Sequence, residues 1–128
     1  MKRIDLSFLT LAALALLIGV GLGIYMGASQ NFQYAPVHAH LNLVGWASLA
    51  IFGLTYRAYP ALAEGTLAKV HLLASGSGGL LLPLGIYFVI FRDQGLLVFA
   101  ASWLVLIGVL IFLIQLLRAH RVTARPDA

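Results

Sequence analysis

The chain has 128 residues, of which 62% are hydrophobic and only 9% are charged, with a formal net charge of +4. A soluble domain carries roughly 25% charged residues, so these residues could not cover a water-exposed surface with polar groups. The charges lie outside long uncharged segments, so they bear on membrane orientation and do not indicate a nucleic-acid partner.

Three long segments contain no Asp, Glu, Lys or Arg: residues 6–56, 70–91 and 94–117. Apolar runs of this length are typical of transmembrane helices. Polar, proline and glycine breaks divide them into four predicted helices, at about Leu6–Ala28, Val37–Tyr56, Leu67–Phe91 and Gly95–Leu117. Short connections make successive helices antiparallel neighbours. We therefore expect residues 1–128 to form one all-α domain, an integral membrane four-helix antiparallel bundle.

Basic residues predict the orientation of these helices. Seven of the eight flank one side of the predicted bundle: Lys2, Arg3, Arg57, Lys69, Arg118, Arg121 and Arg125. The positive-inside rule therefore places both termini and the second loop in the cytoplasm, in a cytoplasmic (inner) membrane. Aromatic residues at the helix ends are expected to anchor the chain at the two interfaces: Tyr25, Phe32 and Tyr34 outside, Tyr56 and Tyr59 inside.

Small residues predict close packing in two helices. Gly19, Gly23 and Gly27 are spaced by four, so they share one face, and in lipid such a face permits close approach of a second helix. Glycine is also simply common in membrane helices, which is the alternative. The segment 75–79 (Ser-Gly-Ser-Gly-Gly) forms a second small patch, which would face a neighbouring helix or a flat cofactor.

Two histidines, His38 and His40, open the predicted second helix on the outer side. Histidine within a membrane is costly and marks function by default. Residues two apart differ by about 200° around a helix, so the two imidazoles point to opposite faces and cannot both bind one mononuclear metal. Such a pair suits two separate sites, each completed by another helix or subunit, with neutral imidazole on heme iron as the obvious chemistry. Hydrated interfacial histidines are the alternative, and spacing alone leaves both open.

The segment from His38 to Trp46 (His-Ala-His-Leu-Asn-Leu-Val-Gly-Trp), continuing through Gly53 to Tyr56, Arg57 and Pro60, resembles heme–copper oxidase subunit I. The most similar branch is that of the nitric oxide reductases and short stand-alone relatives. The family's catalytic subunit has twelve helices in three pseudo-repeats of four. Heme ligands lie on the second helix of a repeat, and in one repeat a His-x-His pair serves two hemes.

The resemblance implies that this chain is one four-helix repeat, with His38 and His40 matching the heme ligands. Three copies would rebuild twelve helices, so we expect a homotrimer in which His38 of one protomer and His40 of the next ligate heme b. The family's copper site needs three histidines, including an adjacent pair, and this sequence has no adjacent pair. Autonomous oxidase activity is therefore not expected, and the resemblance implies electron transfer or redox or gas sensing instead.

Other polar residues are candidates for the same site. Arg92 would pair with heme propionates or, alternatively, with Asp93 in a turn. Asn42 would orient His38 through a hydrogen bond, or serve as a cap. Trp46 would pack on a porphyrin face or in the core. His71, on the cytoplasmic side, is expected to be an interfacial residue beside Lys69.

Two other functions remain open. One is a copper- or other metal-binding membrane protein that uses His38, His40 and Met26. The other is a non-catalytic structural or assembly subunit. The expected partners are the lipid bilayer, further copies of the chain, and a redox partner or quinol.

Overall fold

A computed structural model describes residues 3–123, with side chains described as far as residue 120, and within this range it contains helices and no strands. The elements in chain order are α1 (Ile4–Ser29), the 3₁₀ helix η1 (Phe32–Tyr34), α2 (Ala35–His40), the π-helix η2 (Leu41–Ser48), α3 (Leu49–Ala58), the 3₁₀ helix η3 (Pro60–Ala63), α4 (Thr66–Arg92) and α5 (Leu96–Thr123).

Four helical segments of the described chain are long and apolar enough to cross a membrane: Ile4–Ser29, Phe32–Ala58, Thr66–Arg92 and Leu96–His120. The second combines η1, α2, η2 and α3. These lengths fit a multi-pass membrane protein, and they confirm the predicted four helices, each somewhat longer than its apolar core.

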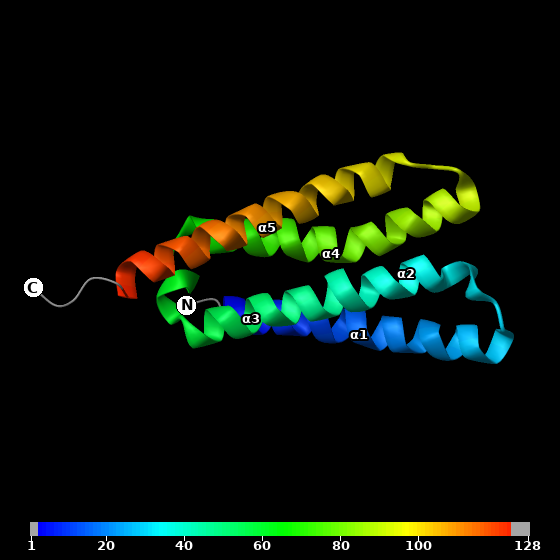
Figure 1. Ribbon diagram of the computed structural model, residues 1–128, viewed down its shortest axis with the longest axis horizontal. Helices are drawn as coiled ribbons and strands as arrows, with labels where there is room; N and C mark the ends of the chain where they lie inside the picture. The colour runs from blue at the N-terminus through cyan, green and yellow to red at the C-terminus, as the bar shows by residue number, and fades with distance from the viewer. Residues whose placement is uncertain (1–2, 124–128) are drawn as a thin grey trace, which may run out of the picture.

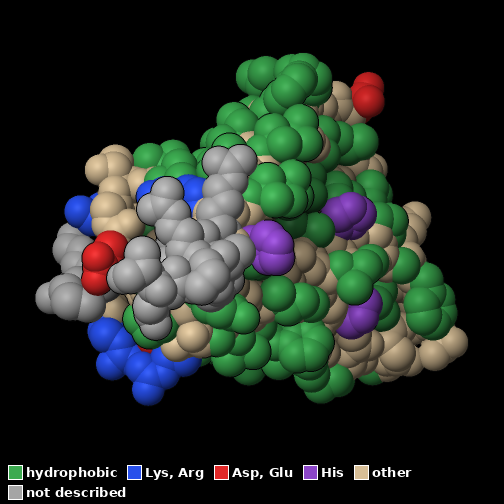
Figure 2. Space-filling view, turned by 60° about the vertical axis from the view of Figure 1, so that its left-hand side comes forward, with side chains coloured by type: hydrophobic (Ala, Val, Ile, Leu, Met, Phe, Trp, Pro, Cys, Tyr) green, Lys and Arg blue, Asp and Glu red, His purple; other side chains and the backbone are tan. Residues whose placement is uncertain are grey.

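The four segments run antiparallel, with α1 beside the α2–η2–α3 segment and α4 beside α5 (Figure 1). The start of α1, η3 and the last turns of α5 lie at one end, which we call the η3 end. At the opposite end, the η1 end, lie η1 and the connection from α4 to α5. Lys and Arg side chains gather around the η3 end, whereas most of the remaining surface in view is hydrophobic (Figure 2).

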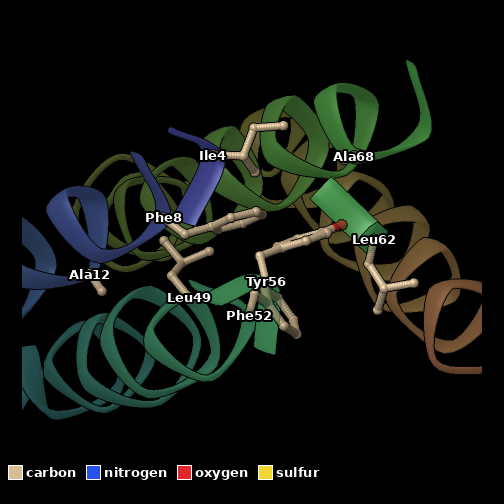
Figure 3. Close-up of a cluster of buried hydrophobic side chains, with 8 residues drawn as sticks. All are labelled: Ile4, Phe8, Ala12, Leu49, Phe52, Tyr56, Leu62 and Ala68. Carbon is tan, nitrogen blue, oxygen red and sulfur yellow. The ribbon is translucent and has the colours of Figure 1, made fainter. Parts of the chain in front are cut away.

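A buried hydrophobic cluster fills the bundle near the η3 end (Figure 3). It consists of Ile4, Phe8, Ala12, Leu49, Phe52, Tyr56, Leu62 and Ala68. Phe8 of α1 stacks on Tyr56 of α3 with ring centroids 5.6 Å apart. A smaller cluster of Ala15, Val37 and Leu41 packs α1 against α2 and the start of η2, nearer the η1 end.

The small residues of α4 bring it close to three neighbours. An ideal Cβ on Gly78 would lie 2.9 Å from the Val105 nitrogen of α5, and one on Gly76 would lie 2.8 Å from Leu11 of α1. A Cβ on Gly79 would lie 3.3 Å from Leu49, the first residue of α3. The small patch of residues 75–79 therefore packs against neighbouring helices, as the first of the two expected alternatives proposed.

The sequence predicted a regular α-helix for the second span. The structure differs, because residues 41–48 form a π-helix. Within this π-helix, the Asn42 side-chain amide donates to the His38 carbonyl oxygen of α2 (2.8 Å). A side chain that bonds to the backbone ladder in this way locally perturbs a helix. π-helical turns frequently occur at functional sites, and this one follows directly on His40.

Candidate functional site

The two candidate ligands lie on the short helix α2, whose position is fixed by its apolar residues. Pro36 stands in the first turn, where its missing N–H costs nothing. Val37 and Leu41 are buried against α1 and α4. His38 and His40 flank this buried face and are both partly exposed.

His38 lies in a groove on α1 made by two glycines. Its Nδ1 is 2.8 Å from the Gly19 carbonyl oxygen, and because a carbonyl only accepts, Nδ1 carries the proton and donates it. An ideal Cβ on Gly23 would lie 2.9 Å from His38 Cε1, so only glycine leaves room for the ring. The expected close packing is thus present at Gly19 and Gly23, but Gly27 faces open space.

Asn42 lies beside the same histidine, although its hydrogen bond goes to the His38 backbone and not to the ring. Its amide nitrogen lies 3.4 Å from His38 Nδ1 and 2.8 Å from the His38 carbonyl oxygen. Since Nδ1 already donates to Gly19, the amide donates to the carbonyl. An ideal Cβ on Gly19 would lie 2.6 Å from the Asn42 amide nitrogen, so this side chain fills the same groove.

His40 is held by its own helix. Its Nδ1 lies 2.8 Å from the Pro36 carbonyl oxygen, four residues earlier, and therefore also donates a proton. That carbonyl is near the start of α2, so the bond directs the Nδ1 side of the ring back toward the first turn of its own helix. His38 is thus fixed by a neighbouring helix and His40 by local structure.

The two histidines use the same ring nitrogen in the same way. In both, Nδ1 donates to a backbone carbonyl, so Nε2 is the nitrogen left to act as a ligand, and no hydrogen bond from a described residue occupies either Nε2. Metal-bound histidines characteristically donate their second ring nitrogen to a carbonyl or carboxylate in this way. The side chains present therefore fit two Nε2 ligands, one for each of two metal centres.

Two further candidates show no described link to these histidines. Arg92 is exposed at the η1 end, and none of the described carboxylates forms an ion pair with it, which removes the alternative pairing with Asp93. Asp93 instead ends α4 in a left-handed conformation, with φ of 54°. Trp46 is 40% exposed on η2, so it is not the core tryptophan that the sequence allowed.

The prediction for His71 is wrong. The side chain is fully buried rather than interfacial, because α4 turns Lys69 outward and His71 toward α1, α3 and α5. Its ring lies among Phe8, Phe52 and Phe112, with centroid distances of 5.0, 4.7 and 5.7 Å. It stands near the η3 end, away from the two candidate ligands.

Tyr56, predicted as an interfacial anchor, is also buried, and its hydroxyl lies 2.8 Å from His71 Nδ1. Gln115 of α5 is buried as well, and its amide donates to the Leu62 carbonyl (2.9 Å) and to the Tyr56 oxygen (3.4 Å). The Tyr56 hydroxyl and His71 Nδ1 therefore share a buried hydrogen bond, whereas His71 Nε2 has no hydrogen-bond partner among the described residues and is enclosed by aromatic rings. Sequence reasoning missed this hydrogen-bonded group, although Tyr56 and His71 flank the same predicted loop.

Among residues 3–120, no three His, Cys, Asp or Glu side chains come together in a way that could hold a metal ion. Comparisons with models of protein families, with curated proteins and with solved structures found no match.

Proposed function

We propose that the chain is a b-type heme-binding membrane protein for electron transfer or redox or gas sensing. The observation that carries this proposal is the shared state of His38 and His40, whose Nδ1 protons bond to the Gly19 and Pro36 carbonyls. Each Nε2 is thereby directed to act as a ligand for a separate iron. Heme bound by histidines on both sides supplies reversible one-electron chemistry.

Three other candidate residues would contact the heme or stabilise its histidine ligands. Arg92 is an exposed guanidinium at the same end that pairs with no described carboxylate, and its planar fork suits a propionate. Trp46 presents an exposed indole on the next turns of the span and would pack on a porphyrin face. Asn42 fills the groove beside His38 and would limit movement of its ring.

The same proposal includes a homotrimer related to heme–copper oxidase subunit I. The two histidines lie on different sides of α2, so each iron needs a second axial ligand from elsewhere. His38 of one protomer and His40 of the next would supply such a pair at every interface of a closed ring. A heterologous interface of this kind closes into a ring when its rotation permits.

The decisive experiment is the absorption spectrum of purified protein, oxidised and dithionite-reduced, for wild type, His38→Ala and His40→Ala. We expect sharp reduced α and Soret bands that are lost in either variant. His120→Ala is the matched control, because this exposed residue ends the last span at the η3 end, away from His38 and His40, and should leave the bands unchanged.

A protein that stays colourless after addition of hemin would refute heme binding. Metal analysis would then separate copper binding from a purely structural role. The mass of the detergent-solubilised protein should equal that of three chains, and a monomer that retains heme would refute the trimer alone.

A further inference from the structure

A second candidate site lies at the η3 end of the bundle, away from the two histidines on α2. A pocket of about 310 Å³ is bounded by the connection from α3 to α4 and by the last turns of α5. Its walls are largely apolar, with Pro60, Leu62 and Ala119 among them. This volume is at the lower limit of typical small-molecule pockets, about 300–1,000 Å³.

Two opposite charges line this pocket without pairing. Glu64 belongs to the connection and Arg118 to α5, and no described ion pair joins either of them to any group within 4.0 Å. Elsewhere at this end a carboxylate is paired, since Asp5 contacts Arg3 and Arg57. The pocket therefore presents the Arg118 guanidinium and the Glu64 carboxylate as two separate charged groups.

The position of the cation is set by the buried core. Arg118 Nη1 donates to Gln115 Oε1 (3.3 Å), and Gln115 is itself anchored on the Leu62 carbonyl. Because Gln115 is only 1% exposed, this anchor is fixed. This contact uses one N–H, and no other described residue bonds to the guanidinium, so its other N–H groups would serve a ligand.

The place of the pocket limits the class of ligand. It stands where the four apolar spans end, which is the level of lipid headgroups. A phosphate suits the guanidinium fork of Arg118, and a primary ammonium, which has three donors, suits the carboxylate of Glu64.

We propose that this pocket binds the headgroup of phosphatidylethanolamine, with its phosphate on Arg118 and its ammonium on Glu64. Glu64 disfavours a purely anionic headgroup such as phosphatidylglycerol. A choline headgroup has no N–H to donate, and its recognition needs an aromatic cage, whereas Tyr59 is the one aromatic residue among the described lining. This site does not depend on the proposed heme.

The test is native mass spectrometry of the full-length protein with equimolar phosphatidylethanolamine, phosphatidylcholine and phosphatidylglycerol of identical acyl chains. For wild type we expect about fivefold greater retention of phosphatidylethanolamine, the ratio that one exposed charge pair can supply. Glu64→Gln should remove this preference. Arg118→Gln should lower retention of all three lipids about fivefold, because all three carry the phosphate.

Lys69→Gln is the matched control, since Lys69 is an exposed basic residue near the same end that does not line the pocket. It should change neither retention nor preference. Ala61→Leu narrows the pocket and leaves both charges in place, so it should lower retention of all three lipids. This variant tests the pocket independently, in case a charge variant fails to fold. Equal retention of the three lipids by wild type, a preference that survives Glu64→Gln, or an equal effect of Lys69→Gln would overturn the proposal.

Discussion

Single atoms decide how the candidate heme ligands are held. The His38 ring is placed by one carbonyl of α1 and by the missing Cβ of Gly23, whereas His40 needs only a carbonyl of its own helix. The two ligands should therefore differ in their sensitivity to changes in α1, because only His38 depends on the packing of another helix.

Gly23→Ala tests this difference. The new Cβ would lie 2.9 Å from His38 Cε1 and would displace the ring. We expect the reduced Soret band to fall to the level of His38→Ala. Gly27→Ala is the control, because a Cβ there meets no described atom within 4 Å and should leave the spectrum unchanged. Equal spectra for the two variants would contradict the proposed placement of His38.

The buried pair of Tyr56 and His71 should stabilise the fold and leave heme binding alone. Tyr56→Phe deprives His71 Nδ1 of its partner in the core, so we expect a loss of about 1–3 kcal/mol in the free energy of unfolding. His71→Leu combined with Tyr56→Phe should cost less than the sum of the single variants, because the pair is removed together. Unfolding in detergent measures both effects. Additive losses would show that the two side chains do not interact.

Among the elements, the π-helix η2 sets the path of the second span. Gly45 is buried within it, at the crossing of three segments. An ideal Cβ on this residue would lie 2.8 Å from Ala15 Cβ of α1 and 3.3 Å from the Gly79 carbonyl oxygen of α4. The span can stay in this position only while residue 45 has no side chain.

Gly45→Ala should therefore be destabilising by about 1–3 kcal/mol, the usual cost of overpacking a core. A lower unfolding temperature in detergent is the expected readout. Gly21→Ala provides the comparison, because its Cβ would meet nothing within 4 Å and alanine favours helix. If both variants unfold alike, the three segments do not pack at Gly45 as described.

For the whole molecule, the charge distribution predicts which end faces the cytoplasm. Because the chain has no cysteine, one introduced cysteine reports its side of the membrane without further changes. We expect Glu64→Cys, in the connection after η3, to react with a membrane-impermeant maleimide only after cells are opened. Gln94→Cys, at the η1 end, should react in intact cells. The reverse pattern would contradict the positive-inside assignment.

The sequence by itself determined the class of the protein, four apolar spans with short connections, because length and hydropathy suffice to define a membrane helix. It also singled out His38, His40 and Asn42, since polar residues within a long apolar run stand out without knowledge of their neighbours. The tertiary structure decided what these residues contact. Which helix faces meet determines that His38 bonds to the Gly19 carbonyl and that Tyr56 and His71 are buried. The π-helical turn depends on the same packing. Side-chain packing between helices distant in sequence fixes those faces, and a hydropathy pattern in which nearly every residue is apolar carries little information about them.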